Sequence, residues 1–278
     1  MKKLVLAILF PALMPTFLLA QKNYRGSEFG LFLGGSYYLG DLNRNGHFNS
    51  FTKPAGGIIY RYNFNPRLSF KANMLFGTLF ADDARSGVPA QEQRNLHFKS
   101  PLTELAGEIE FNFMNYVIGS HRTLFTPYVF VGIAGFKFNP KAQVDGNWFA
   151  LQPLSTEGQE TTFNGQKRYK LNQLAIPFGV GVKAWISSRV GLALEWGWRK
   201  TFTDYLDDVS TTYVDPVRLG VERGPVASYF SDTGTMAGTG INVGKQRGDP
   251  SDKDWFSFAG VSLMFKLRNR YQSCNSYK

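Results

Sequence analysis

The segments LSFKANMLFG (residues 68–77) and ELAGEIEFNF (residues 104–113) alternate between polar or small residues and mostly apolar ones. In the first segment Ser69, Lys71 and Asn73 share one parity, and large apolar residues dominate the other. Successive side chains of a β-strand point to opposite faces, so this pattern predicts strands with one polar and one apolar face. Segments 173–184 and 190–199 repeat the pattern.

Four further segments predict strands with a weaker alternation, at residues 28–39, 55–64, 124–138 and 254–267. Short connections follow the second, fourth and sixth strands, near residues 65–66, 117–123 and 187–188. Long connections follow the first, third, fifth and seventh strands, at residues 40–53, 80–100, 139–169 and 202–253. Bacterial outer-membrane barrels alternate short periplasmic turns with long extracellular loops in this way. The sequence therefore predicts an all-β transmembrane antiparallel β-barrel of about eight strands, with both termini in the periplasm.

The first twenty residues, MKKLVLAILFPALMPTFLLA, combine a basic start with an apolar run and a small residue, Ala20, before Gln21. These features predict a cleaved secretory signal peptide at residues 1–20. The alternative is an uncleaved membrane anchor, for which the two prolines and the short run are unfavourable. We expect the barrel to cover residues 21–267 and a periplasmic tail to cover residues 268–278.

The polar faces of the predicted strands carry charges of both signs. The candidate residues of this lumen charge network are Arg61, Lys71, Glu104, Glu108, Glu110, Lys183, Glu195 and Arg199. An eight-stranded barrel has an interior just wide enough for side chains to fill. We expect the opposed charges to pair and close the lumen, and the alternative is a narrow path for ions or small solutes. A protein-conducting pore is excluded at this size.

Catalytic and metal-binding patterns are weak. The three histidines, His47, His97 and His121, fall in predicted loops or turns rather than beside a nucleophile and a carboxylate. One cysteine and scattered histidines give no zinc spacing, and no glycine-rich phosphate loop occurs. The acidic run formed by Asp204, Asp207 and Asp208 could hold calcium, but it lacks the EF-hand spacing and favours a hydrogen-bonded loop anchor. We therefore predict no enzyme activity, no cofactor and no metal.

The chain has a net charge of +10, and removing Lys2 and Lys3 leaves about +8. Nucleic acid is an improbable partner for such a barrel, whereas outer-membrane lipid headgroups and lipopolysaccharide phosphates suit its cations. The expected tail is basic, with Arg268 and Arg270, and it either meets an acidic partner surface or is an unstructured end. It also contains Cys274. A lone exported cysteine favours either an intermolecular disulfide with a periplasmic partner or a free thiol without a role.

Several motifs resemble those of the PorG-type outer-membrane barrels of the type IX secretion system in Bacteroidota. The most specific motif is RKTFTDYLDDVSTTYVDP, residues 199–216. Shorter matches are GGSYYLGD (34–41), PYVFVGIAG (127–135), QLAIPFGVG (173–181) and RGDPSDKDWF (247–256). The Arg-Gly-Asp tripeptide at residues 247–249 lies in the last of these motifs, so an adhesion role need not be invoked for it.

The resemblance implies a barrel that tethers a periplasmic ring, built from the lipoprotein PorK and its partner PorN, to the outer membrane. A basic tail that points at the periplasm fits this role, with Arg268 and Arg270 as candidate partner-binding residues and Cys274 as a candidate covalent link to the ring lipoprotein. We expect the segment Thr201–Pro216 to fold back over the barrel mouth. The alternatives are a surface adhesin or structural barrel with ligand-binding loops, and a narrow channel.

Overall fold

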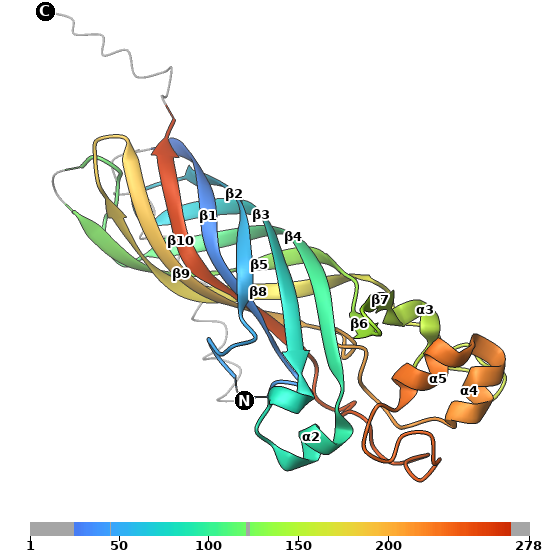
Figure 1. The fold of residues 1–278 in the computed structure, drawn as a ribbon. Helices are drawn as coiled ribbons and strands as arrows, with labels where there is room; N and C mark the ends of the chain where they lie inside the picture. The colour runs from blue at the N-terminus through green and yellow to red at the C-terminus, as the bar shows by residue number, and fades with distance from the viewer. Residues whose placement is uncertain (1–24, 45, 121–122, 268–278) are drawn as a thin grey trace, which may run out of the picture.

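The computed structural model describes residues 25–44, 46–120 and 123–267, and its main body is a set of long antiparallel strands (Figure 1). The signal peptide predicted at residues 1–20 and the tail predicted at residues 268–278 lie outside the described residues. The barrel strands are β1 (Gly26–Leu39), β2 (Lys53–Asn63), β3 (Leu68–Asp82), β4 (His97–Asn112), β5 (Phe125–Phe138), β8 (Asn172–Trp185), β9 (Val190–Thr201) and β10 (Trp255–Lys266).

These eight strands form a closed ring. Each strand pairs antiparallel with its neighbours in the order β3-β2-β1-β10-β9-β8-β5-β4, and β3 also pairs with β4. The first and last strands meet with Gly34 opposite Gly260. A Cβ atom on Gly34 would lie 2.2 Å from the carbonyl oxygen of Ala259, so this junction requires a residue without a side chain. The predicted eight-stranded antiparallel barrel is confirmed.

Short turns and long loops alternate as expected, and they gather at opposite ends of the barrel (Figure 1). The end that carries residues 64–67, 113–120, 123–124 and 186–189 is called the short-turn end here, and the other is the long-loop end. The long loops contain the helices η2 (Asp83–Arg85), α2 (Pro89–Arg94), α3 (Leu151–Leu154), α4 (Pro216–Arg223) and α5 (Pro225–Ser231) and the hairpin strands β6 (Lys141–Val144) and β7 (Asn147–Ala150). Within the described ranges, no helix is long and apolar enough to cross a membrane.

One expectation about these loops was wrong. Strands β3 and β4 extend beyond the predicted segments 68–77 and 104–113, and their pairing continues to Asp82 and His97. The β6–β7 hairpin lies in the long connection predicted at residues 139–169, and Lys141 pairs it to Lys99 of β4. Where strands leave the apolar layer, their outward residues need not be apolar, so backbone pairing continues without the alternation that predicts it.

The barrel is apolar outside and charged inside. Leu33 and Leu105 are 72% and 65% exposed, whereas Lys71 and Glu104 are both 0% exposed. Near the long-loop end, aromatic rings pack against one another on the outer surface, namely Phe178, Trp196, Trp198 and Trp255. An apolar outer band with an aromatic girdle is the surface of a barrel that spans a membrane.

Buried apolar side chains cover both ends of the charged interior. At the short-turn end, Tyr116 and Ile118 of the β4–β5 turn pack inward against Gly191. Towards the long-loop end, aromatic side chains fill the interior, namely Phe32, Tyr38, Phe98, Phe136, Phe138, Phe256 and Phe258. The charged layer is therefore enclosed between two apolar layers.

Candidate functional site

The structure places all eight residues of the lumen charge network inside the barrel, and none of them is more than 6% exposed. They come from β2, β3, β4, β8 and β9, which face one another across the interior. The alternation of each strand explains this placement, because a residue of the polar parity on any strand points to the barrel axis.

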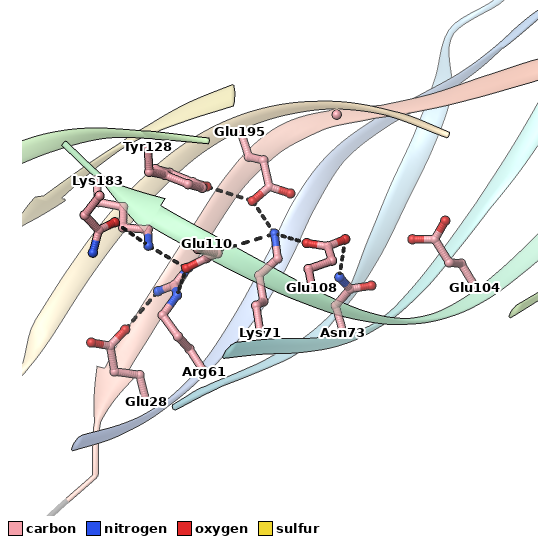
Figure 2. Close-up of polar contacts among 12 residues, drawn as sticks. Glu28, Arg61, Lys71, Asn73, Glu104, Glu108, Glu110, Tyr128, Lys183 and Glu195 are labelled. Atoms are coloured by element: carbon pink, nitrogen blue, oxygen red, sulfur yellow. Dashed lines mark hydrogen bonds and ion pairs between the residues drawn. The ribbon is translucent and has the colours of Figure 1, made fainter. Parts of the chain in front are cut away.

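Lys71 on β3 lies at the centre of the network (Figure 2). Its Nζ is 2.7 Å from Oε2 of Glu108 and 2.6 Å from Oε2 of Glu195. Nζ of Lys71 also lies 4.1 Å from the ring centroid of Phe130. The Tyr128 hydroxyl donates to the same oxygen of Glu195 at 2.7 Å. One ammonium group thus connects strands β3, β4 and β9 across the lumen.

Glu110 organises the layer nearer the short-turn end (Figure 2). Its Oε2 accepts from Nε of Arg61 at 2.7 Å and from Nζ of Lys183 at 2.5 Å. Nη1 of Arg61 also donates to Oε2 of Glu28 at 2.8 Å, and Nδ2 of Asn63 donates to Oε1 of Glu28 at 2.7 Å. Glu28 was absent from the predicted network, although a carboxylate at the start of the predicted strand segment 28–39 could have indicated it.

A third group lies nearer the long-loop end. Nε of Arg199 is 3.1 Å from Oε2 of Glu104, and its Nη2 donates to Oε1 of Glu104 at 3.1 Å. The guanidinium carbon of Arg199 lies 4.9 Å from the ring centroid of Phe258. Paired charges and aromatic rings therefore fill successive layers of the lumen, and this interior fits a sealed barrel better than an ion path.

The motif at residues 199–216 lies over the long-loop mouth. The Tyr38 hydroxyl is 2.6 Å from Oδ2 of Asp207 and 2.7 Å from Oδ1 of Asp254, and all three residues are buried. The backbone amides of Val209 and Leu206 donate to Asp207 and Asp254 respectively. A single hydroxyl proton cannot serve both carboxylates. Burial raises the pKa of Asp207 and the pKa of Asp254 well above the ordinary value of a carboxyl group. The nearby charge of Asp207 raises the pKa of Asp254 further.

A second buried cluster joins this motif to Glu157 of the third long loop and to Arg247, which lies later in the motif's own loop. Oε1 of Glu157 accepts from Nη1 of Arg247 at 3.0 Å and from the Ser210 amide at 2.9 Å. Nη1 of Arg247 also donates to the backbone oxygen of Asp208 at 2.6 Å. Burial raises the pKa of Asp208 to about 6, and burial raises that of Asp204 to about 7. We call residues 201–216, together with Glu157, Arg247 and Asp254, the cap.

The Arg-Gly-Asp tripeptide is part of the cap structure. Arg247 is 3% exposed and engaged with Glu157, and a Cβ atom on Gly248 would lie 2.5 Å from Oδ2 of Asp41. An adhesion tripeptide must present its arginine and aspartate together to a partner. Burial of Arg247 argues against that function for these residues.

The two histidines that the structure describes each have a hydrogen-bond partner from the chain itself. Nδ1 of His47 lies 3.1 Å from the hydroxyl of Tyr37, and Nε2 of His97 accepts from the amide of Gln143 at 2.9 Å. His121 and the tail residues Arg268, Arg270 and Cys274 lie outside the described residues. Across the part of the chain that the structure describes, no group of three or more potential ligands has the geometry to hold a metal ion.

A closed antiparallel barrel with an apolar outer band, an aromatic girdle and a charge-filled interior defines an integral β-barrel membrane protein. Residues 3–218 match the family model described as Domain of unknown function (DUF6089). The chain belongs to this family. A search of curated proteins gave no significant match.

Solved structures of bacterial barrels are similar to the chain over most of its length. The attachment invasion locus protein Ail of Yersinia pestis shares 7% identity and a TM-score of 0.41, covering 87% of this chain and 99% of Ail. Neisserial surface protein A shares 8% identity and a TM-score of 0.42, covering 88% of this chain and 99% of its own. The outer membrane protein OprG from Pseudomonas aeruginosa shares 10% identity and a TM-score of 0.36, covering 88% of this chain and 99% of OprG.

Proposed function

We propose that this barrel is a non-enzymatic outer-membrane component of the type IX secretion system that tethers the periplasmic PorK/PorN ring to the membrane. The observation that carries the proposal is the filled lumen, where Lys71, Glu108 and Glu195 meet at 2.6–2.7 Å. A barrel whose interior is occupied by paired charges acts through its surfaces. The secretion system is inferred from the resemblance of residues 199–216 and the four shorter motifs to PorG-type barrels.

The orientation expected of bacterial barrels supports a periplasmic contact, because it places the short turns and the chain termini in the periplasm. Strand β1 begins at Gly26 and β10 ends at Lys266, both at the short-turn end (Figure 1). The amide of Leu267 donates to the carbonyl of Ser27 at 2.8 Å, which fixes this point of the chain at the rim. Arg268, Arg270 and Cys274 follow Leu267 in the sequence.

In this proposal Cys274 forms a disulfide with the ring lipoprotein. The test is a mild-detergent pull-down of the tagged barrel from native outer membranes, resolved on non-reducing and reducing gels. We expect recovery of PorK and a high-mass band that collapses on reduction and is lost in Cys274→Ser. Recovery of PorK without such a band would overturn only the covalent link. A barrel recovered alone would overturn the tether.

A second candidate function is ligand binding by the extracellular loops. A cavity of about 540 Å³ lies between the first, second and last long loops and is lined by Arg44, Arg94, Tyr213 and Lys245 among others. Its mixed polar and apolar lining favours a small polar ligand or a lipopolysaccharide headgroup. Ligand binding becomes the favoured function if the pull-down recovers the barrel alone and substitutions such as Lys245→Ala abolish surface binding of lipopolysaccharide.

A further inference from the structure

The charges of this chain are distributed unevenly between the two ends of the barrel. All 21 acidic residues lie either inside the barrel or at the long-loop end. We define the short-turn rim as residues 25–27, 64–67, 113–120, 186–189 and 266–267. This rim contains no aspartate or glutamate, and it carries Arg25, Arg67, Arg189 and Lys266.

The acidic residue nearest to the rim in sequence, Glu28, does not offset this charge. Glu28 is 3% exposed and is engaged by Arg61 and Asn63 within the lumen. Arg67 and Arg189, in contrast, are exposed in the turns. A surface with cations and no carboxylates produces a positive potential that attracts an acidic partner.

The rim is also a built surface rather than a set of loose turns. Nε of Arg67 donates to Oδ1 of Asn115 at 3.0 Å, which joins the β2–β3 turn to the β4–β5 turn. Nζ of Lys266 donates to the carbonyl of Ile118 at 3.1 Å, which joins β10 to the same turn. Tyr116 and Ile118 fill the space beneath. The β4–β5 turn therefore closes the short-turn end of the barrel.

The position of the β4–β5 turn favours a protein over a lipid as the partner of the rim. Lipid headgroups surround a barrel and reach its perimeter, whereas the β4–β5 turn covers the lumen at the centre. Lys266 belongs to the inward parity of β10, with Met264, and its Nζ donates to the carbonyl of Ile118 in this turn. A partner that covers this centre must approach from the periplasm.

We propose that the short-turn rim docks an acidic protein surface in the periplasm. This inference rests on the proposed function, from which the periplasmic location of the rim is taken. It adds that the surface bound by the rim is acidic. Charge pairing at this rim holds the partner non-covalently, independently of the tail and of Cys274.

The test uses the full chain in native outer membranes and the same pull-down at low and high ionic strength. The test variant is the double charge reversal Arg67→Glu/Arg189→Glu, and the conservative variant is Arg67→Lys/Arg189→Lys. The matched control is Lys167→Glu/Lys170→Glu, which reverses two exposed lysines at the long-loop end. Heat-modifiable migration on gels verifies that every variant has a folded barrel.

We expect the rim reversal to lower recovery of the periplasmic partner about tenfold and to remove its salt dependence. The lysine variant and the long-loop control should retain recovery. Unchanged recovery in the folded rim reversal would overturn the rim proposal and leave the tether standing. Unchanged recovery with a loss of co-purified anionic phospholipid would assign the rim to lipid headgroups instead. Failure of the wild-type barrel to recover any periplasmic protein would overturn both proposals.

Discussion

Lys71 illustrates how one residue can hold together a barrel interior. Its ammonium group contacts Glu108 and Glu195 and lies 3.6 Å from Glu110, and no part of the side chain is exposed. Buried charges are costly to transfer from water, and they are tolerated only when partners and hydrogen bonds surround them. The buried positive and negative charges of the interior therefore offset one another, and removing one cation leaves buried carboxylates without a counter-charge.

Substitution Lys71→Met tests this balance. We expect a loss of about 3–5 kcal/mol in the free energy of unfolding, because Glu108 and Glu195 lose their shared cation. Urea unfolding in phospholipid vesicles, followed by tryptophan fluorescence, measures the change. The matched control is Lys137→Met on the outer side of β5, for which we expect little change. Equal stabilities of the two variants would contradict a structural role for the network.

At the scale of elements, the cap is held by charges that lie far apart in the sequence. Glu157 lies in the third long loop, whereas Arg247 lies in the same long loop as the segment 201–216, and Glu157 contacts both Arg247 and Ser210 of that segment. Substitution Glu157→Gln keeps the side-chain shape and removes the charge opposite a buried guanidinium. We expect the cap of this variant to open, with protease cleavage within residues 204–254 on intact cells.

The control for cap opening is Arg218→Ala at the start of α4. The ion pair of Arg218 with Asp215 is 3.6 Å long and largely exposed, and exposed pairs contribute little to stability. We expect cleavage of this variant to match the wild-type chain. A Glu157→Gln variant as resistant as the wild type would show that the cap does not depend on this pair.

The cap should also respond to pH, because burial raises the pKa of Asp204 from 3.8 to about 7. A raised carboxyl pKa stabilises the folded cap most at low pH, where Asp204 is protonated in both states. This contribution is lost as the pH rises from about 3.8 to about 7. Asp208, with a pKa of about 6, acts in the same direction.

Thiol labelling in a Cys274→Ser background measures this response. Val209→Cys places a thiol at a position that is 2% exposed within the cap, and Ser251→Cys gives an exposed reference for the intrinsic pH dependence of the reagent. We expect labelling of the cap thiol, relative to the reference, to increase as the pH rises towards 7. Asp204→Asn should flatten the increase, and a cap equally closed at every pH would contradict the prediction.

The elements of the chain differ in how well the sequence predicts them. Membrane-facing strands were predictable because the apolar layer imposes a strict alternation, and every strand of the barrel fell on a predicted segment. The polar parity likewise identified the lumen cations. The cap was not predictable in detail, because contacts such as Glu157 to Arg247 join loops without periodicity. The continuation of β3 to Asp82 was missed for the related reason that alternation fades outside the apolar layer.

For the whole molecule, the filled interior predicts a barrel that does not conduct. Purified wild-type protein in planar lipid bilayers should give no steady open-channel current, because paired side chains occupy the charged layer and apolar residues close both ends. Lys71→Ala should remain closed, since Phe130 and Tyr128 still fill the cross-section. Discrete current steps from the wild-type barrel would support the narrow-channel alternative.

The tether itself is tested most directly by site-specific photocrosslinking in living cells. A photoreactive phenylalanine analogue replaces Ser188 in the β8–β9 turn or, as the matched control, Gln166 in a long loop, and both positions are exposed. We expect a crosslink from position 188 to a protein of the periplasmic ring and none from position 166. Crosslinks to the ring from neither position, or only from the long loop, would contradict the tether.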